Sequence, residues 1–99
     1  MNTKNASECT CPIERSLAVL GDSWTMLILR DANAGVTRFD AFKKRLGIAP
    51  TILTRRLAML TQERLLEKKL YSERPPRQGY VLADAGRDFL PVLFMVAAW

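Results

Sequence analysis

The spacing of apolar residues first changes along this chain at Leu66. Before that point they recur every three or four positions, as Leu53, Leu57 and Leu60 do, which is the spacing of an amphipathic helix. From Leu66 to Leu82 they stand in two short runs with polar residues between, which is typical of half-buried strands. The chain is therefore predicted to be mainly α, with a small β-hairpin.

Capping residues and helix breakers divide the helical part into segments. Proline suits the first position of a helix, and glycine is the usual residue just past its end. The run Thr37-Arg38-Phe39-Asp40 has the pattern of a capping box, and Pro91 is expected to kink or break the last helix. Helices are expected from Pro12 to Gly21, from Asp22 or Ser23 to about Gly35, from Thr37 to Gly47, from Pro50 to about Gln62, and from Ala83 or Asp84 to the end of the chain.

A proline-rich tip joins the two strand-like runs. Pro75 and Pro76 have no backbone N–H for a sheet ladder and a fixed φ, so they predict a stiff turn and a poor strand. Arg74 and Arg77 flank them, and their charges must point outward. Short helices followed by such a basic hairpin predict a winged helix-turn-helix. We expect this DNA-binding domain over residues 11–99, behind a flexible arm of residues 1–10.

Positive charge is concentrated in the middle of the chain. Between Val36 and Tyr80 there are eleven Lys/Arg and four Asp/Glu, whereas the other residues include four Lys/Arg and six Asp/Glu, for a formal net charge of +5. A basic stretch on a winged helix is the electrostatic signature of a nucleic-acid-binding surface. Double-stranded DNA is therefore the expected partner.

Several kinds of site are excluded by what the chain lacks. It has no histidine, which removes His-based acid–base catalysis and most zinc sites. Cys9 and Cys11 alone cannot close a tetrahedral metal site, and no glycine-rich phosphate loop is present. We expect no enzyme activity, no cofactor and no metal. The polar first ten residues and the short apolar run Phe89–Trp99 predict a cytoplasmic protein without a membrane segment.

The helix from Pro50 to Gln62 is expected to enter the major groove with its first turns. A rotation of about 100° per residue away from the leucine stripe places Thr51 and Arg55 on the opposite face. Arg55 is expected to read a guanine through two hydrogen bonds. The predicted DNA-binding residues are Pro50, Thr51, Thr54, Arg55 and Arg56 on this helix, Lys43 and Lys44 on the preceding helix, and Arg74 and Arg77 on the wing. The two wing arginines are expected to contact phosphates or the minor groove.

Two groups of basic residues leave alternatives open. Arg56 lies about 60° from the leucine stripe, so it either lays its stem on the core, pairs with Glu63 or contacts a phosphate. Lys43, Lys44 and Arg45 make either a solvated helix face or a set of backbone-phosphate contacts.

Six motifs follow one another over nearly the whole chain: Cys11-Pro12, GDSWT at Gly21–Thr25, LILRD at Leu27–Asp31, RFDAFKKRLGIAPTILTRRLAML at Arg38–Leu60, PPR…Y.L at Pro75–Leu82, and AGR…L.PVL at Ala85–Leu93. In this order they resemble the HxlR-type winged helix-turn-helix transcriptional regulators, whose winged helix is MarR-like. The resemblance implies a homodimer on a palindromic operator. Ala49 and Ala83 stand where family members often have Ser and Thr, so the helices after them are expected to be less well capped.

The segment Phe89–Trp99 is apolar on every side, and a helix of this kind should be buried on every side. A partner chain is the simplest cover, in agreement with the dimerisation through the first and last helices that the resemblance implies. The alternative is that the chain is truncated after Trp99 and that missing residues cover this face. The predicted dimer interface consists of Ile13, Leu17, Leu90, Leu93, Phe94 and Ala97.

Cys11 is a candidate redox-sensing residue. It directly precedes a helix, whose dipole favours the thiolate, and the resemblance implies that a cysteine here can sense oxidants or electrophiles. The alternative is an inert thiol beside the helix cap. Two other functions stay open: a winged-helix module for protein or RNA contacts, and a regulator that responds to a small ligand bound between Trp24 and the last helix. The effector is unknown.

Overall fold

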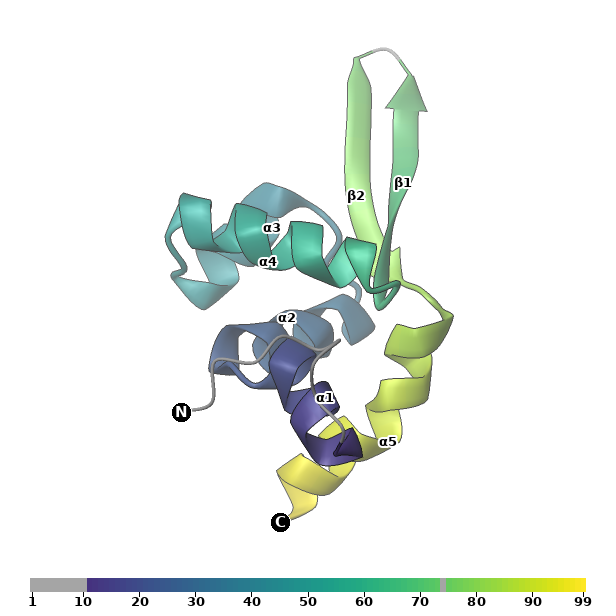
Figure 1. Ribbon diagram of the computed structural model, residues 1–99. Coiled ribbons are helices and arrows are strands. Elements are labelled where there is room, and N and C mark those ends of the chain that lie inside the picture. The colour runs from purple at the N-terminus through teal and green to yellow at the C-terminus, as the bar shows by residue number, and fades with distance from the viewer. Residues whose placement is uncertain (1–10, 74) are drawn as a thin grey trace.

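A computed structural model describes residues 11–73 and 75–99 of the chain. The described residues confirm the predicted fold class, because five helices and one antiparallel hairpin form a winged helix-turn-helix (Figure 1). The arm expected over residues 1–10 lies outside the described residues. The elements are α1 (Pro12–Leu20), α2 (Ser23–Asn33), α3 (Phe39–Leu46), α4 (Pro50–Gln62), β1 (Leu66–Glu73), β2 (Pro76–Leu82) and α5 (Asp84–Ala98).

Most helix ends follow the predicted signals. Pro12 and Pro50 occupy the first positions of α1 and α4. Asp22 caps α2, because its Oδ1 accepts a hydrogen bond from the backbone N–H of Thr25 at 2.8 Å. Gly47 ends α3 in the left-handed conformation, with a φ of 65°, which glycine adopts without a steric penalty.

The capping box predicted at the start of α3 was wrong. Arg38, one residue later than expected, is the N-cap, and its carbonyl accepts the N–H of Phe42 at 3.1 Å. Thr37 lies outside the helix because it belongs to the attachment of the hairpin: its carbonyl accepts the N–H of Tyr80 at 2.7 Å. A tertiary backbone bond thus determines where α3 begins.

Helices α4 and α5 form although their N-caps are weak, and α5 also contains an internal proline. Ala49 and Ala83 are the N-cap residues of these helices, and neither makes a side-chain cap bond, which confirms the expected weaker capping. The break considered at Pro91 does not occur, because α5 runs through it from Asp84 to Ala98. A proline removes the backbone N–H at its own position, and the residues on both sides remain helical.

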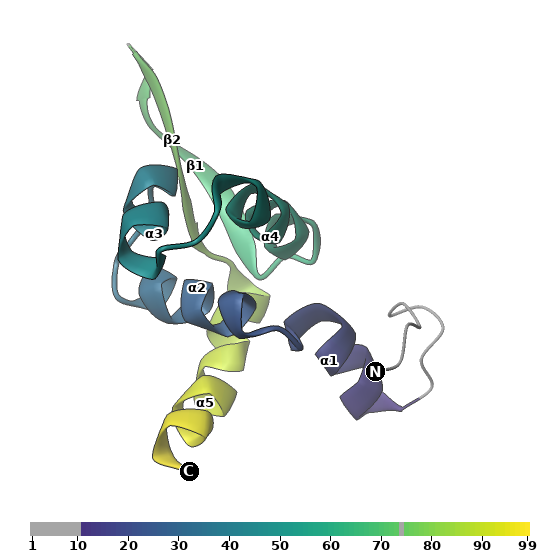
Figure 2. The same ribbon diagram turned by 90° about the vertical axis from the view of Figure 1, so that its left-hand side faces the viewer.

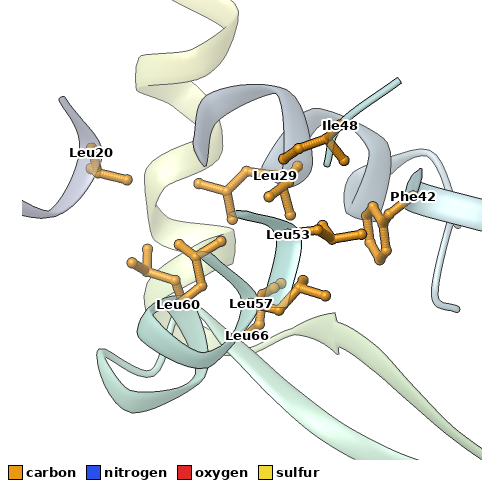
Figure 3. Packing of buried hydrophobic residues seen from close by; sticks show 10 residues of the cluster. Leu20, Leu29, Phe42, Ile48, Leu53, Leu57, Leu60 and Leu66 are labelled. Atoms are coloured by element: carbon orange, nitrogen blue, oxygen red, sulfur yellow. The ribbon is translucent and has the colours of Figure 1, made fainter. Parts of the chain in front are cut away.

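The core lies where α2, α3, α4 and the start of β1 meet. Phe42 of α3 is fully buried and points toward Leu53 of α4 (Figure 3). Burial of one such side chain contributes about 1.5–3 kcal/mol, so this cluster fixes how α3 and α4 pack against each other. The buried hydrophobic residues are Leu20, Ile28, Leu29, Phe42, Ile48, Leu53, Leu57, Leu60, Leu65 and Leu66.

The hairpin projects from the helices as a wing (Figure 1). Its strands pair antiparallel, with Glu73 opposite Pro76 near the tip and a register shift between Leu70 and Ser72. Pro76 is the first residue of β2, so the predicted turn through both prolines was wrong at this position. A proline is tolerated there because both strands of a two-stranded sheet are edge strands.

Helices α1 and α5 lie on the side of α2 away from the hairpin (Figures 1 and 2). The first turns of α5 pack closely on the rest of the domain at Gly86, where a Cβ would overlap the carbonyl of Leu65. Further along α5, Phe94 and Met95 are exposed. No helix in the described part of the chain is long and apolar enough to cross a membrane.

Candidate nucleic-acid interface

The polar face of α4 is exposed as the leucine spacing predicted. Thr51, Thr54 and Arg55 are exposed, whereas Leu53 is fully buried. The Oγ1 of Thr54 donates a hydrogen bond to the carbonyl of Pro50 at 2.9 Å. Within residues 11–73 and 75–99, the side chain of Arg55 has no ion-pair or hydrogen-bond partner. Its guanidinium is therefore available to a base edge.

Arg56 is held by another part of the domain. Its Nε lies 2.8 Å from Oδ2 of Asp22, and the Arg56 side chain is 33% exposed. This contact is an ion pair without an aligned hydrogen bond at Nε. The pairing considered with Glu63 was wrong, because Arg56 pairs with the N-cap residue of α2 instead. The ion pair ties α4 to the beginning of α2.

A buried carboxylate joins α2 to α3. Asp31 is fully buried; its Oδ2 accepts from Arg45 Nε at 3.2 Å and its Oδ1 from Arg30 Nε at 3.1 Å. A buried charge requires such partners. Arg45 is therefore engaged in the fold, whereas Lys43 and Lys44 on the same helix are exposed. Sequence reasoning missed Asp31, because Arg45 lies 14 positions away and no local pattern marks the pair.

The wing contributes Arg77, which is exposed on β2. Arg74 lies outside the described residues. Sequence reasoning missed Arg38, which is exposed at the start of α3 and lines a shallow groove together with Arg77. Helices α3 and α4 and the hairpin all lie on the side of α2 opposite to α1 and α5 (Figures 1 and 2). The basic side chains that remain exposed on these elements thus share one half of the molecule.

Cys11 is the N-cap of α1 and a free cysteine of intermediate exposure. Its position directly before the helix agrees with the sequence prediction. Cys9 lies outside the described residues. In the described ranges, no group of His, Cys, Asp and Glu side chains is arranged to hold a metal ion.

Apolar side chains are exposed on α1 and α5. Ile13 is 70% exposed and Phe94 is 54% exposed. One shallow apolar groove runs between α1 and α5 and includes Ile13 and Leu17, and a second lies between α2 and α5. Of the residues predicted for a dimer interface, Ile13, Leu17, Phe94 and Ala97 are exposed, and Leu90 and Leu93 are partly buried.

The second groove is near the place where a small-ligand site was considered. It has a volume of about 430 Å³ and is lined by Met26 and Leu27 of α2 and by Leu93 of α5, among other residues. Trp24 is not part of its lining, because this side chain packs against the core. The groove therefore uses a different side of α2 from the one the sequence suggested.

Comparison with known proteins gives consistent matches. The family described as HxlR-like helix-turn-helix matches residues 19–99. The uncharacterized HTH-type transcriptional regulator Rv3095 of Mycobacterium tuberculosis is 39% identical over 87 residues, which are 88% of this chain and 55% of the relative. The chain thus spans about half the length of this curated relative.

Solved structures of similar regulators superpose on almost the whole chain. The transcriptional regulator YodB from B. subtilis, in its reduced form, matches with a TM-score of 0.80 and 28% identity over 92% of this chain and 91% of YodB. The redox regulator HypR in its reduced form matches with a TM-score of 0.82 and 27% identity over 90% of this chain and 89% of HypR.

Proposed function

Because the chain belongs to the HxlR-like helix-turn-helix family, we propose that it is a sequence-specific DNA-binding transcriptional regulator, acting as a homodimer on a palindromic operator. The observation that carries this proposal is the exposed start of α4, where Thr51 and Arg55 face solvent beside a basic wing. In a winged helix this is the surface that enters the major groove. An enzyme activity has no support in this arrangement.

Each predicted contact has a role in the proposed complex. Arg55, Thr51 and Thr54 face the bases from α4, with Pro50 at the helix start close to the DNA. Lys43, Lys44, Arg74 and Arg77 contact phosphates and fix the position of the domain on the duplex. The Nε of Arg56 already pairs with Asp22. A phosphate contact of Arg56 would therefore be made by its Nη1 and Nη2 atoms.

The proposed dimer is formed by α1 and α5. A solitary protomer leaves Ile13 and Phe94 more than half exposed, and a second copy covers them most simply. A two-fold axis would place two α4 helices on half-sites about one turn of DNA apart, roughly 34–36 Å. The domain that does this extends over residues 11–99, with residues 1–10 as a preceding arm.

The proposal is tested by selecting genomic DNA fragments with purified, reduced protein and sequencing what is retained. Promoter fragments that share an inverted repeat would support the regulator and identify its targets. Retention of unrelated fragments without a shared site would contradict sequence specificity. Retention of no DNA would favour the alternative, a winged-helix module that binds protein or RNA.

Replacement of Arg55 by Ala should relax specificity. Loss of a bidentate contact with guanine is expected to reduce discrimination at one base pair of each half-site by about 1–3 kcal/mol, while binding to unrelated DNA changes little. The measurement is the ratio of operator affinity to random-duplex affinity at fixed salt. Arg77→Ala is the contrasting variant, because a phosphate contact should weaken binding to both DNAs alike. Equal losses on both DNAs from both variants would contradict this division of roles.

We further propose that Cys11 senses oxidants. The support is its position as a free thiol of intermediate exposure at the N-cap of α1, one of the two helices of the proposed dimer. The related regulator HypR is a redox regulator. Oxidation of Cys11 would change the packing of α1 and with it the spacing of the two α4 helices.

Cys11→Ser should make operator binding insensitive to oxidant. The wild-type protein is expected to release operator DNA on treatment with a thiol oxidant and to rebind on reduction, whereas the variant stays bound. Cys9→Ser removes the other cysteine: it should still release the operator on oxidation if Cys9 is incidental, whereas loss of the response would identify Cys9 as the thiol that resolves oxidised Cys11. If Cys11→Ser releases the operator as the wild type does, Cys11 is not the sensor.

A further inference from the structure

A basic groove lies between the beginning of α3 and strand β2. It has a volume of about 200 Å³ and is lined by Arg38, Phe39 and Asp40 from one side and by Arg77 and Gln78 from the other. The groove thus brings together two arginines that are 39 positions apart in the sequence.

The two sides of this groove are fixed relative to each other. The N–H of Tyr80 donates to the carbonyl of Thr37 at 2.7 Å, which binds β2 to the residue before Arg38. Gly79 is buried at the same point, and a Cβ there would overlap the ring of Tyr71 and crowd the side chain of Thr37. A side chain at position 79 would require the Tyr71 ring to move, and the hydrogen bond from Tyr80 holds the base of the wing next to the start of α3.

The side chains of Arg38 and Arg77 are exposed and available to bind a ligand. Among the residues that the structure describes, neither side chain makes an ion pair or hydrogen bond, even though Asp40 lines the same groove. Four other arginines, namely Arg30, Arg45, Arg56 and Arg87, are each paired with an aspartate. A groove with two guanidinium charges against one carboxylate is short of negative charge, and an added anion would relieve the repulsion between the two arginines.

We propose that Arg38 and Arg77 together hold a single phosphate of the DNA backbone. This inference rests on the proposed function. It adds Arg38 to the DNA-binding residues and states that Arg38 and Arg77 share one phosphate. The planar guanidinium group forms paired hydrogen bonds with phosphate oxygens, and two such groups in one groove can reach one phosphate from two sides. The contact would fix the helix-turn-helix and the wing to the same phosphate of one DNA strand.

A double-mutant cycle tests whether the phosphate is shared. Arg38→Ala and Arg77→Ala should each weaken binding to operator and random duplex by about tenfold, the size of one charge-assisted hydrogen bond. The double variant should lose little more DNA affinity than either single variant, because one arginine alone binds the phosphate poorly. The slope of log K against log salt should fall by about one unit in the double variant, as expected for one phosphate.

Contacts to two separate phosphates would give a different result and would overturn the inference. The losses would then multiply to about a hundredfold, and the salt slope of the double variant would fall by about two units. An unchanged affinity in Arg38→Ala would also overturn it, without affecting the function proposed above. Failure of the wild-type protein to bind any DNA would instead contradict that function.

Two further variants keep the experiment specific. Arg15→Ala removes one exposed charge from α1, on the other side of α2. Because α1 belongs to the proposed dimer interface, affinity and salt slope are measured on random duplex after the sedimentation coefficient is shown to equal that of the wild type, and both should be unchanged. Arg38→Lys keeps the charge but lacks the planar fork, so it should keep the wild-type salt slope and lose part of the affinity. A salt slope reduced equally by Arg15→Ala would show a net-charge effect and would overturn the proposed contact.

Discussion

Phe94→Glu should lower operator affinity by about three orders of magnitude, toward the level of non-specific binding. Phe94 is 54% exposed on α5, so a glutamate there leaves the protomer core intact. In the proposed dimer the same position is covered by the partner, where an unpaired carboxylate is strongly unfavourable. The measurements are the sedimentation coefficient, which should change to that of a monomer, and the operator affinity.

Ala85→Glu is the matched control for this variant. It places the same charge on an exposed position of α5, in the first helical turn and away from the apolar C-terminal half. An acidic residue near a helix N-terminus is slightly favourable, so dimerisation and operator binding should be retained. A Phe94→Glu protein that remains dimeric would contradict the proposed use of α5 in the interface.

Phe42→Ala should reduce the free energy of unfolding by about 3–5 kcal/mol. Phe42 is fully buried between α3 and α4 (Figure 3), and its removal leaves a cavity in the cluster that holds the two helices of the helix-turn-helix. For a domain of this size the loss is a large part of the total stability. The measurement is urea denaturation followed by circular dichroism.

Phe42→Leu separates loss of volume from loss of the ring. Leucine fills most of the same space, so this variant should recover most of the stability lost in Phe42→Ala. The operator affinity measured at low temperature, where both variants are folded, should follow the same order. Equal stability of Phe42→Ala and wild type would show that this cluster does not hold α3 against α4.

The fold could be predicted closely because its main signals are local. The leucine spacing of α4, the prolines at the starts of α1 and α4, and Gly47 after α3 all act within one or two helical turns. The leucine spacing determines which face of a helix is buried, and the prolines and the glycine determine where a helix begins or ends. These features are visible in a sequence without knowledge of the tertiary structure.

The site could be predicted only where it depends on one helix. The exposed positions of Thr51 and Arg55 follow directly from the stripe on the opposite side of α4. Arg45 pairs with Asp31 of α2 and Arg56 with Asp22 at the N-cap of α2. These partners lie too far away in the sequence to leave a periodic pattern. Arg38 escaped notice for the same reason, because its groove is completed by the distant strand β2.

The aspartate at the N-cap of α2 and the aspartate within this helix have a consequence for which positions of the protein can change. Asp22 and Asp31 stand near opposite ends of the helix and engage Arg56 of α4 and Arg45 of α3. These ion pairs hold α2 against α3 and α4, and neither of them includes Thr51 or Arg55. In the proposed complex Thr51 and Arg55 face the bases, so substitutions there would alter DNA recognition while both ion pairs of the framework remain.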